Sequence, residues 1–283
     1  MKSSGKLYVV ATPIGNMEDI TLRAVRILGE VDLIAAEDTR QTGKLLACHG
    51  IKGHLISVHE HNEIERTAGL IRKLKDGCSI ALVTDAGTPG VSDPGYHLVR
   101  VAIEEKISVV PIPGVSAAIA ALSASGLPTD SFLFVGFLPK KSSKRLQQLH
   151  DLSNQPGTII VYESPRRILS LLKELESVMG DRYAVLSREI TKLHEEFIRG
   201  TVSEIWADLG GRQSVKGECT LLISGCEKDK PVSMEIIQEE IQSALKLKNG
   251  TVSDIVKDIA RRYPLSKSRI YEEALKIKAN ETS

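Results

Sequence analysis

Short apolar runs alternate with longer amphipathic segments through about the first 125 residues. The apolar runs, rich in aliphatic and β-branched side chains, predict strands over Leu7–Ala11, Leu33–Ala36, Leu55–Val58, Ile80–Val83 and Val109–Pro111. The amphipathic segments predict helices near Thr21–Gly29, Gln41–His49, Asn62–Asp76, Tyr96–Glu105 and Ser116–Ser125. Strands that alternate with helices of this length indicate an α/β domain whose parallel sheet is covered on both faces.

The turn-forming segment Gly126-Leu127-Pro128-Thr129 marks the predicted boundary between two α/β domains, 1–127 and 128–228. In the second domain the expected strands are Phe132–Phe137, Thr158–Tyr162, Tyr183–Leu186 and Thr220–Ser224. The expected helices are Ser143–Ser153, Pro165–Met179 and Ser203–Leu209. This mixture allows some strands of the second domain to be antiparallel.

The end of the chain, 232–283, is predicted to be a small helical unit. Glu227–Pro231 is charged, contains proline and is typical of a linker. Helical spacing resumes after Thr251, Pro264 ends that helix, and Ser266 is placed to cap the next one. The arrangement resembles a helix-turn-helix unit.

Composition places the chain among ordinary globular proteins, because 42% of its 283 residues are hydrophobic and 26% are charged. With 37 Lys and Arg against 36 Asp and Glu, any nucleic-acid contact must come from a local patch. The four cysteines form no CxxC pair. The N-terminus lacks the profile of a signal peptide, and no apolar stretch approaches the roughly 20 residues of a membrane span. We therefore expect a cytoplasmic protein that does not enter a membrane.

Three loops rich in Gly, Pro and small polar residues follow predicted strands: Thr12–Asn16, Thr84–Gly95 and Pro113–Ala118. Open α/β sheets bind ligands at the carboxyl ends of their strands. Glycine lets a backbone approach a ligand closely, and the free N–H groups of a helix that starts near Ser116 suit a carboxylate. Asp85 or Asp93 could accept hydrogen bonds from an amine or from ribose hydroxyls. The alternative is that these loops are only tight turns, although the middle one exceeds the usual length of such connections.

Several common sites are disfavoured by the sequence. It contains no GxGxxG after the first strand, no GxxxxGK[ST] and no HExxH, which argues against dinucleotide-binding folds, P-loop NTPases and zinc proteases. His54, His59, Glu60 and His61 could suggest a metal, but no second cluster of ligands completes a site, so no metal is expected.

Longer blocks that contain these loops carry a family resemblance. In chain order they are VATPIGNMEDITLRA, AAEDTR, SVHEHNE, VTDAGTPGVSDPGYHLVR, PIPGVSAAIAALSASGLPTD, FVGFLPKK, VYESPRRI, REITKLHEE and KGE. From about Lys6 to Ser224 the chain resembles the ribosomal RNA small-subunit methyltransferase I family. That family is the ribosomal branch of the tetrapyrrole methylases, which are class III S-adenosylmethionine methyltransferases.

The resemblance implies two α/β domains of tetrapyrrole-methylase type, S-adenosyl-L-methionine in the cleft between them, and a homodimer. It also implies methylation of a cytidine ribose 2′-hydroxyl in the decoding region of small-subunit ribosomal RNA, either as naked RNA or in an assembled subunit. The residues it places at the cofactor are Pro13, Asp85, Gly87, Ser92, Asp93, Ser116, Ala117 and Tyr162.

Three alternatives stay open at this point. A corrin or porphyrin C-methylase is the nearest, but such enzymes usually begin VGxGPGDxxLLT, whereas this chain has TPIGNMED in place of most of those glycines. A non-catalytic nucleic-acid-binding regulator would explain the tail and leave the three loops unused. An enzyme of nucleotide sugars or phosphates would use the loops but lacks the expected Gly-rich and Lys-bearing signatures.

Transfer of a methyl group to a ribose hydroxyl needs positioning and help from a base or a cation. Glu37, Asp38 and Arg40 follow a predicted strand close to the cofactor loops, and Lys192 is a candidate from the second domain. The alternative for the first group is a helix cap with an ion pair. The alternative for Lys192 is a solvated or interfacial lysine.

Local basic groups could neutralise RNA phosphates. Lys140, Lys141, Lys144 and Arg145 place four positive charges within six residues, and Arg166 and Arg167 precede a predicted helix. Between Lys246 and Lys278 there are nine Lys or Arg and four acidic residues. The alternative for each group is a solvated surface.

Overall fold

Five parallel strands form the first sheet in a computed structural model that describes residues 5–226, 234–246, 252–262 and 267–280. The strands are β1 (Lys6–Val10), β2 (Leu33–Ala36), β3 (Leu55–Ser57), β4 (Ile80–Val83) and β5 (Ser108–Ile112). Their order is β3-β2-β4-β1-β5, and every neighbouring pair is parallel. The predicted parallel sheet is thus confirmed.

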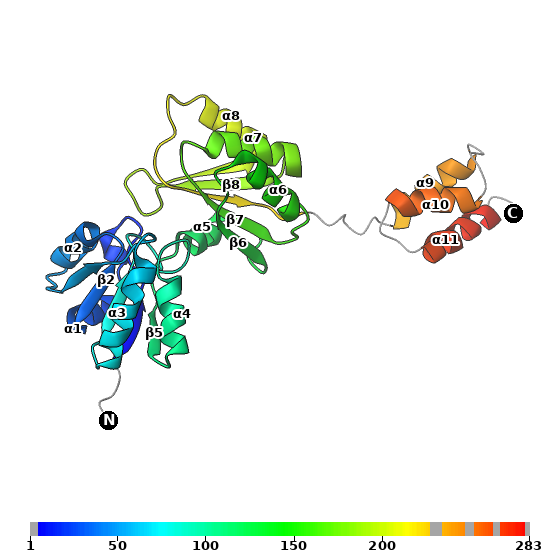
Figure 1. Ribbon diagram of the computed structural model, residues 1–283. Helices are drawn as coiled ribbons and strands as arrows, with labels where there is room; N and C mark the ends of the chain where they lie inside the picture. The colour runs from blue at the N-terminus through cyan, green and yellow to red at the C-terminus, as the bar shows by residue number, and fades with distance from the viewer. Residues whose placement is uncertain (1–4, 227–233, 247–251, 263–266, 281–283) are drawn as a thin grey trace. The chain divides into compact units, whose positions relative to one another are not determined.

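Helices cover both faces of this sheet (Figure 1). Helices α1 (Leu22–Glu30) and α2 (Thr39–Cys48) pack on one face, and α3 (Glu63–Lys75) and α4 (Tyr96–Glu104) pack on the other. Strand β2 shows how the sequence encodes this, because Leu33 and Ala35 join the core under α3 and α4 while Ile34 and Ala36 join the core under α1 and α2. Both faces are buried, which is why the strand is apolar throughout.

The second sheet is mixed and has the order β6-β7-β10-β8-β9. Its strands are β6 (Phe132–Phe137), β7 (Thr158–Glu163), β8 (Tyr183–Arg188), β9 (Glu196–Thr201) and β10 (Cys219–Ile223). The β6–β7 pair is parallel, and the other pairs are antiparallel. Helices α6 (Ser142–Leu152), α7 (Ile168–Met179) and α8 (Val202–Gly210) cover one face. The edge strand β9 was not predicted, because its sequence EFIRGT mixes charged and apolar residues.

Helix α5 (Ala117–Ser125) covers the other face of the second sheet. Ala118, Ala121 and Leu122 pack against residues of β7, β8 and β10, although the helix precedes the boundary predicted at 127. The helix ends at Gly126, whose φ of +82° is the left-handed conformation that closes many helices. The N-terminus of α5 therefore follows β5 of the first sheet while the body of the helix belongs to the second core.

Residues from Glu227 onward form a separate compact unit. Its helices are α9 (Met234–Lys246), α10 (Val252–Arg262) and α11 (Lys267–Asn280), which share a core of Ile237, Ile241, Ile255, Val256, Ile259, Ile270 and Ala274. The predicted linker Glu227–Pro231, and the predicted stop at Pro264 and cap at Ser266, lie outside the described residues. Of the tail's basic side chains, the structure describes that of Lys276, which pairs with Glu273 at 2.7 Å. Nowhere in the described ranges is a helix long and apolar enough to span a bilayer.

Candidate active site

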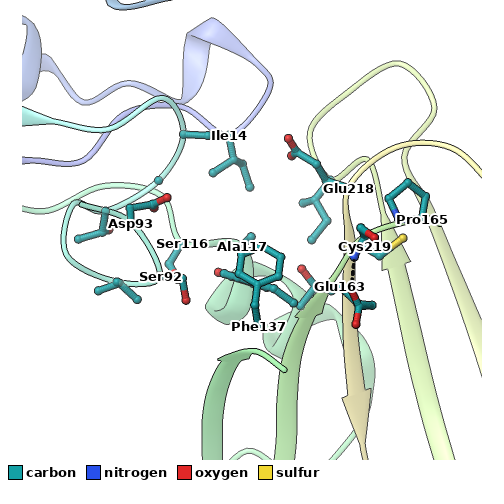
Figure 2. A pocket seen from close by; sticks show the side chains of 18 residues that line it. Ile14, Ser92, Asp93, Ser116, Ala117, Phe137, Glu163, Pro165, Glu218 and Cys219 are labelled. Atoms are coloured by element: carbon teal, nitrogen blue, oxygen red, sulfur yellow. Dashed lines mark hydrogen bonds between the residues drawn. The ribbon is translucent and has the colours of Figure 1, made fainter. Parts of the chain in front are cut away.

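Two neighbouring cavities lie where the loops of the first sheet meet the second sheet. The larger has a volume of about 350 Å³ and the smaller of about 320 Å³. They share Ile14, Ala86 and Glu218 in their walls. Figure 2 shows the larger cavity, with Ser92 and Asp93 on one side and Glu218 and Pro165 on the other. Both volumes fall within the usual range for small-molecule sites, about 300–1,000 Å³.

The loop after β4 is fastened to the end of β1. Thr12 N donates to Gly87 O at 2.8 Å and Gly87 N donates to Thr12 O at 3.0 Å, while Thr12 Oγ1 donates to the Thr84 carbonyl at 3.1 Å. Gly87 has φ +89°, a conformation that other residues adopt only with strain. The glycine therefore lets the loop turn along the wall of the larger cavity.

The far part of the same loop touches the second sheet. Ser92 has φ +65°, and its Oγ would lie 2.7 Å from a Cβ added to Gly136. Gly136 lies at an irregularity in β6 and has φ +74°. A side chain at Gly136 would thus displace Ser92, so the glycine makes room for the wall of the cavity.

The start of α5 is held by Tyr162 of β7. The phenol oxygen of Tyr162 accepts a hydrogen bond from Ala118 N at 3.1 Å, which occupies one of the free N–H groups at the helix start. The ring contacts Phe134 and Phe137 edge to face, with centroid separations of 4.9 and 5.6 Å. Burial raises the pKa of Tyr162, so the phenol is neutral at physiological pH.

The residues predicted at the cofactor divide between the two cavities. Gly87, Ser92, Asp93, Ser116, Ala117 and Tyr162 line the larger cavity. Pro13 and Asp85 line the smaller one. The structure thus brings all eight to one region but separates two of them from the rest.

Carboxylates concentrate around these walls. Glu37 accepts hydrogen bonds from Thr84 Oγ1 at 2.5 Å and from Asp85 N at 3.3 Å. Burial, followed by the negative charges of Glu37 and Asp85, raises the pKa of Asp93 to about 7. Burial likewise raises the pKa of Asp85. A positive charge bound beside these carboxyl groups would favour their ionised forms, so the cavities suit a positively charged ligand.

Asp38 and Arg40 form the cap and ion pair that the sequence left open as an alternative. Asp38 caps α2 by accepting from Arg40 N at 2.8 Å, and the Arg40 guanidinium donates to both carboxylate oxygens, at 3.1 and 2.7 Å. These hydrogen bonds lower the pKa of Asp38 to about 2. Asp38 N in turn donates to Asp85 Oδ1 at 3.0 Å, which ties the start of α2 to the wall of the smaller cavity.

Lys192, in the loop after β8, contacts Glu218, which lies in the walls of both cavities. Its Nζ lies 3.1 Å from Glu189 Oε1 and 3.0 Å from Glu218 Oε2. Burial alone would lower the pKa of Lys192, but the two carboxylates outweigh it and raise that pKa above its usual value. The loop is anchored to the first sheet by Asn16 N, which donates to Thr191 Oγ1 at 3.0 Å. Lys192 is therefore a charged ammonium beside Glu218.

The two carboxylates beside Lys192, those of Glu189 and Glu218, were not among the site residues predicted from the sequence. Glu189 has φ +50° and its carboxylate accepts from Glu218 N at 2.9 Å. A Cβ at Gly217 would lie 2.3 Å from Glu189 Cγ, so Gly217 leaves space for this carboxylate. The only sequence signal for Gly217 and Glu218 was the short KGE block.

Arg145 is not part of an exposed cationic cluster, contrary to the prediction from the sequence. Its side chain is 7% exposed, and its guanidinium donates to Glu174 at 2.6 and 2.8 Å and to the carbonyls of Pro139 and Lys140 at 3.0 and 3.1 Å. Arg145 thus holds the start of α6 against α7. Lys140, Lys141 and Lys144 are exposed.

Arg145→Met is expected to lower the free energy of unfolding by about 3 kcal/mol, because it removes a buried guanidinium and leaves the partly buried Glu174 carboxylate without its partner. Hydrogen bonds from Arg145 lower the pKa of Glu174, so the pair stabilises the folded protein fully at pH values above the ordinary pKa of glutamate. This stabilisation disappears as the pH falls through the lowered pKa. Denaturant unfolding at neutral and acidic pH measures this. Lys144→Met, an exposed change in the same helix, should stay within about 0.5 kcal/mol. Equal stabilities for both variants would contradict the assignment.

The arginines before α7 also differ from each other. Arg167 Nη2 lies 2.5 Å from Glu163 Oε1, and the Arg167 side chain is 25% exposed. Arg166 is exposed. The helix begins at Ile168 rather than at the predicted Pro165, since Pro165 to Arg167 form a turn. Arg167 is therefore an ion-pair partner of β7, and Arg166 is the free cation of the two.

The histidine-rich segment is a structured loop. Asn62 Oδ1 accepts from His59 N at 2.9 Å, and Asn62 Nδ2 donates to Ser57 O at 3.3 Å. Across the described part of the chain, no group of three or more His, Cys, Asp or Glu side chains is arranged to hold a metal ion.

Comparison with known proteins places the chain among methylases. The tetrapyrrole (corrin/porphyrin) methylase family matches residues 6–205. Ribosomal RNA small subunit methyltransferase I of Halalkalibacterium halodurans is 51% identical over 223 residues, covering 78% of this chain and 76% of that protein. The protein of the same name from Synechocystis sp. is 47% identical, covering 98% and 99%, and that from Streptococcus pyogenes is 44% identical, covering 96% and 95%.

Solved structures share the fold. Uroporphyrin-III C-methyl transferase from Thermus thermophilus, complexed with S-adenyl homocysteine, superposes with a TM-score of 0.56 at 22% identity, covering 77% of this chain and 97% of that one. Diphthine synthase superposes with a TM-score of 0.60 at 14% identity, covering 78% and 90%. At these identities the likeness concerns the fold alone, and it confirms the expected tetrapyrrole-methylase architecture.

Proposed function

Because this chain belongs to the ribosomal RNA small subunit methyltransferase I family, within the tetrapyrrole methylases, we propose that it methylates a cytidine ribose 2′-hydroxyl in the decoding region of small-subunit ribosomal RNA. The methyl donor is S-adenosyl-L-methionine. One observation carries the proposal: an acid-lined cavity walled by glycine and small residues, with a second cavity directly beside it.

The larger cavity fits S-adenosyl-L-methionine by its chemistry. That molecule carries a positive sulfonium and a positive ammonium group, and either charge beside Asp93 would favour the ionised form of that carboxyl group. Its adenine needs apolar walls, which Ile14, Phe137 and Ile190 supply. We assign Gly87, Ser92, Asp93, Ser116, Ala117 and Tyr162 to its binding. Uroporphyrin-III C-methyl transferase from Thermus thermophilus, which shares the fold, has a structure in complex with the related S-adenyl homocysteine.

The sulfonium of a bound donor would supply an activated methyl group, so the chain's own work is to position the acceptor hydroxyl and to stabilise its oxygen while the hydroxyl proton passes to water. Lys192, held protonated by Glu189 and Glu218, is the cation that we assign to this role, since its partner Glu218 lies in the walls of both cavities. Glu37 accepts hydrogen bonds from Thr84 and Asp85, which line the smaller cavity, and it thereby orders the cluster of acidic residues. Asp38 and Arg40 act through the start of α2.

The corrin and porphyrin alternative is weaker on two grounds. The relatives at 44–51% identity over most of the chain are named for ribosomal RNA, whereas the porphyrin enzyme is only 22% identical. The loop Thr12–Asn16 also lacks the glycines usual at the first strand of such enzymes. A cytoplasmic location and a homodimer belong to the same proposal.

The direct test supplies the purified protein with S-adenosylmethionine labelled in its methyl group. Small-subunit ribosomal RNA, small ribosomal subunits that lack the mark, and uroporphyrinogen are offered separately. We expect label in ribosomal RNA or in the subunit, and mapping should place it on one ribose 2′-oxygen. Label on a base, or on uroporphyrinogen alone, would reject the proposal.

The exposed lysines before and within α6 are proposed to contact RNA phosphates. Changing Lys140, Lys141 and Lys144 together to Ala should weaken RNA binding and flatten the slope of log K against log salt. The slope changes by about 0.9 per phosphate contact for duplex DNA and about 0.7 for single strands. Filter binding across a salt series measures the slope, and calorimetry should show unchanged affinity for S-adenosylmethionine. A variant with the wild-type slope would make these lysines a solvated surface.

A further inference from the structure

The smaller cavity differs in character from the larger one. Its walls combine apolar side chains, Pro13, Met17 and Leu45, with hydrogen-bonding groups on Gln41 and Thr42. Gln41, Thr42 and Leu45 come from α2, which is bound to the site through the cap at Asp38. Flat apolar contact beside hydrogen-bonding edges is what a nucleoside requires, since its base has apolar faces and polar edges.

Thr42 provides the independent sign of a ligand. The residue is 3% exposed, yet within the described structure its Oγ1 has no hydrogen-bond partner. Thr67 of α3 is equally buried at 3%, and its Oγ1 donates to Glu63 O at 2.7 Å. A buried hydroxyl without a partner is costly, and native proteins seldom retain one without a reason. Thr42 lines the smaller cavity, where a bound molecule could complete its hydrogen bonding.

The position of the smaller cavity restricts what enters it. It meets the larger cavity at Ile14, Ala86 and Glu218, so its occupant lies next to the assigned methyl-donor site. Asp85 and the nearby Glu37 repel a phosphate from the interior but can accept hydrogen bonds from hydroxyl or amino groups. Arg40, whose side chain is 86% exposed, stands outside at the start of α2, where a flanking phosphate could be held.

We propose that the smaller cavity receives the target nucleoside of the RNA, with the Thr42 hydroxyl and the Gln41 amide as its recognition groups. This inference rests on the function proposed above. It transfers Pro13 and Asp85 from the cofactor to the acceptor side of the site. The acceptor hydroxyl then meets the methyl donor at the shared wall, beside Glu218 and the Lys192 ammonium.

The test compares Thr42→Val with Thr42→Ser, using small ribosomal subunits that lack the mark as substrate. Valine has the shape of threonine without the hydroxyl, so Thr42→Val should lower kcat/KM about three- to tenfold, mainly through KM. Serine keeps the hydroxyl and should stay close to wild type. Because the replaced hydroxyl has no protein partner, Thr42→Val should melt at the wild-type temperature or above. Thr67→Val removes a matched buried hydroxyl away from the cavities and should leave kcat/KM unchanged.

Calorimetry with S-adenosylmethionine distinguishes the failures. Unchanged cofactor affinity in Thr42→Val together with the raised KM supports the assignment. A loss of cofactor affinity in Thr42→Val would indicate that the cofactor itself occupies the smaller cavity, and it would overturn the inference. Wild-type kinetics in Thr42→Val would also overturn it while leaving the proposed function intact. If the wild-type protein transfers no methyl group to RNA, the proposed function itself fails.

Discussion

Lys192→Met should lower kcat by about 100-fold while S-adenosylmethionine binds as before. Removing one preorganised donor from a developing oxyanion typically costs about 10²–10³ in kcat. Methionine keeps the apolar stem of the side chain and removes the charge that lies 3.0 Å from Glu218. Because the group acts on the reacting oxygen, kcat and kcat/KM should fall together. Single-turnover methyl transfer and calorimetry provide the two measurements.

The protonation of Lys192 sets a second expectation. Its pKa lies above the usual 10.5 because Glu218 and Glu189 outweigh the effect of burial, so the ammonium is charged throughout the neutral range. The wild-type rate should therefore show no step from Lys192 between pH 6 and 9. A lysine that acted as a neutral base would give such a step. Lys216→Met removes an exposed lysine close to Glu218 and should keep full activity. Full activity in Lys192→Met would show that Lys192 has no part in the reaction and is only a solvated or interfacial lysine.

Much of the fold follows from local patterns in the chain. The inner strands β2 and β4 of the first sheet are buried at every position, so each is a continuous apolar run such as Leu33–Ala36. The strand β9 has no such run, because as an edge strand it carries Glu196 and Arg199 in ion-pair and carbonyl contacts. Helix α5 was located correctly, but its packing on the second sheet could not be predicted, because its partners in β7, β8 and β10 are far from it in the sequence.

The site divides in the same way. The loops that follow β1, β4 and β5 could be predicted, because the carboxyl ends of parallel strands gather at one edge. Glu218 and Glu189 could not, because they approach from the second sheet and become neighbours of Lys192 only through tertiary contacts. Arg145 shows the converse error: four nearby charges suggested a surface patch, while its actual partner, Glu174, is 29 residues away.

Gly87→Val is expected to weaken S-adenosylmethionine binding by about 5- to 150-fold, the equivalent of about 1–3 kcal/mol of overpacking. A Cβ at Gly87 would lie 3.7 Å from Ile14 Cγ2 and 3.9 Å from Val115 O, so the first carbon fits. The two further methyl groups of valine need space along Ile14, a residue of both cavity walls. Valine at φ +89° adds backbone strain that shifts the loop. Isothermal titration of the folded variant measures the loss.

Backbone strain alone must be separated from occupation of the cavity, and Gly126 provides the comparison. Gly126 has φ +82°, close to that of Gly87, and an added Cβ there meets nothing within 4 Å. Gly126→Val should therefore lower thermal stability through strain at the end of α5 while preserving cofactor affinity. Equal losses of affinity in the two variants would attribute the effect to strain in the fold. Loss confined to Gly87→Val would attribute it to the cavity wall, and unchanged affinity in Gly87→Val would place the cofactor elsewhere.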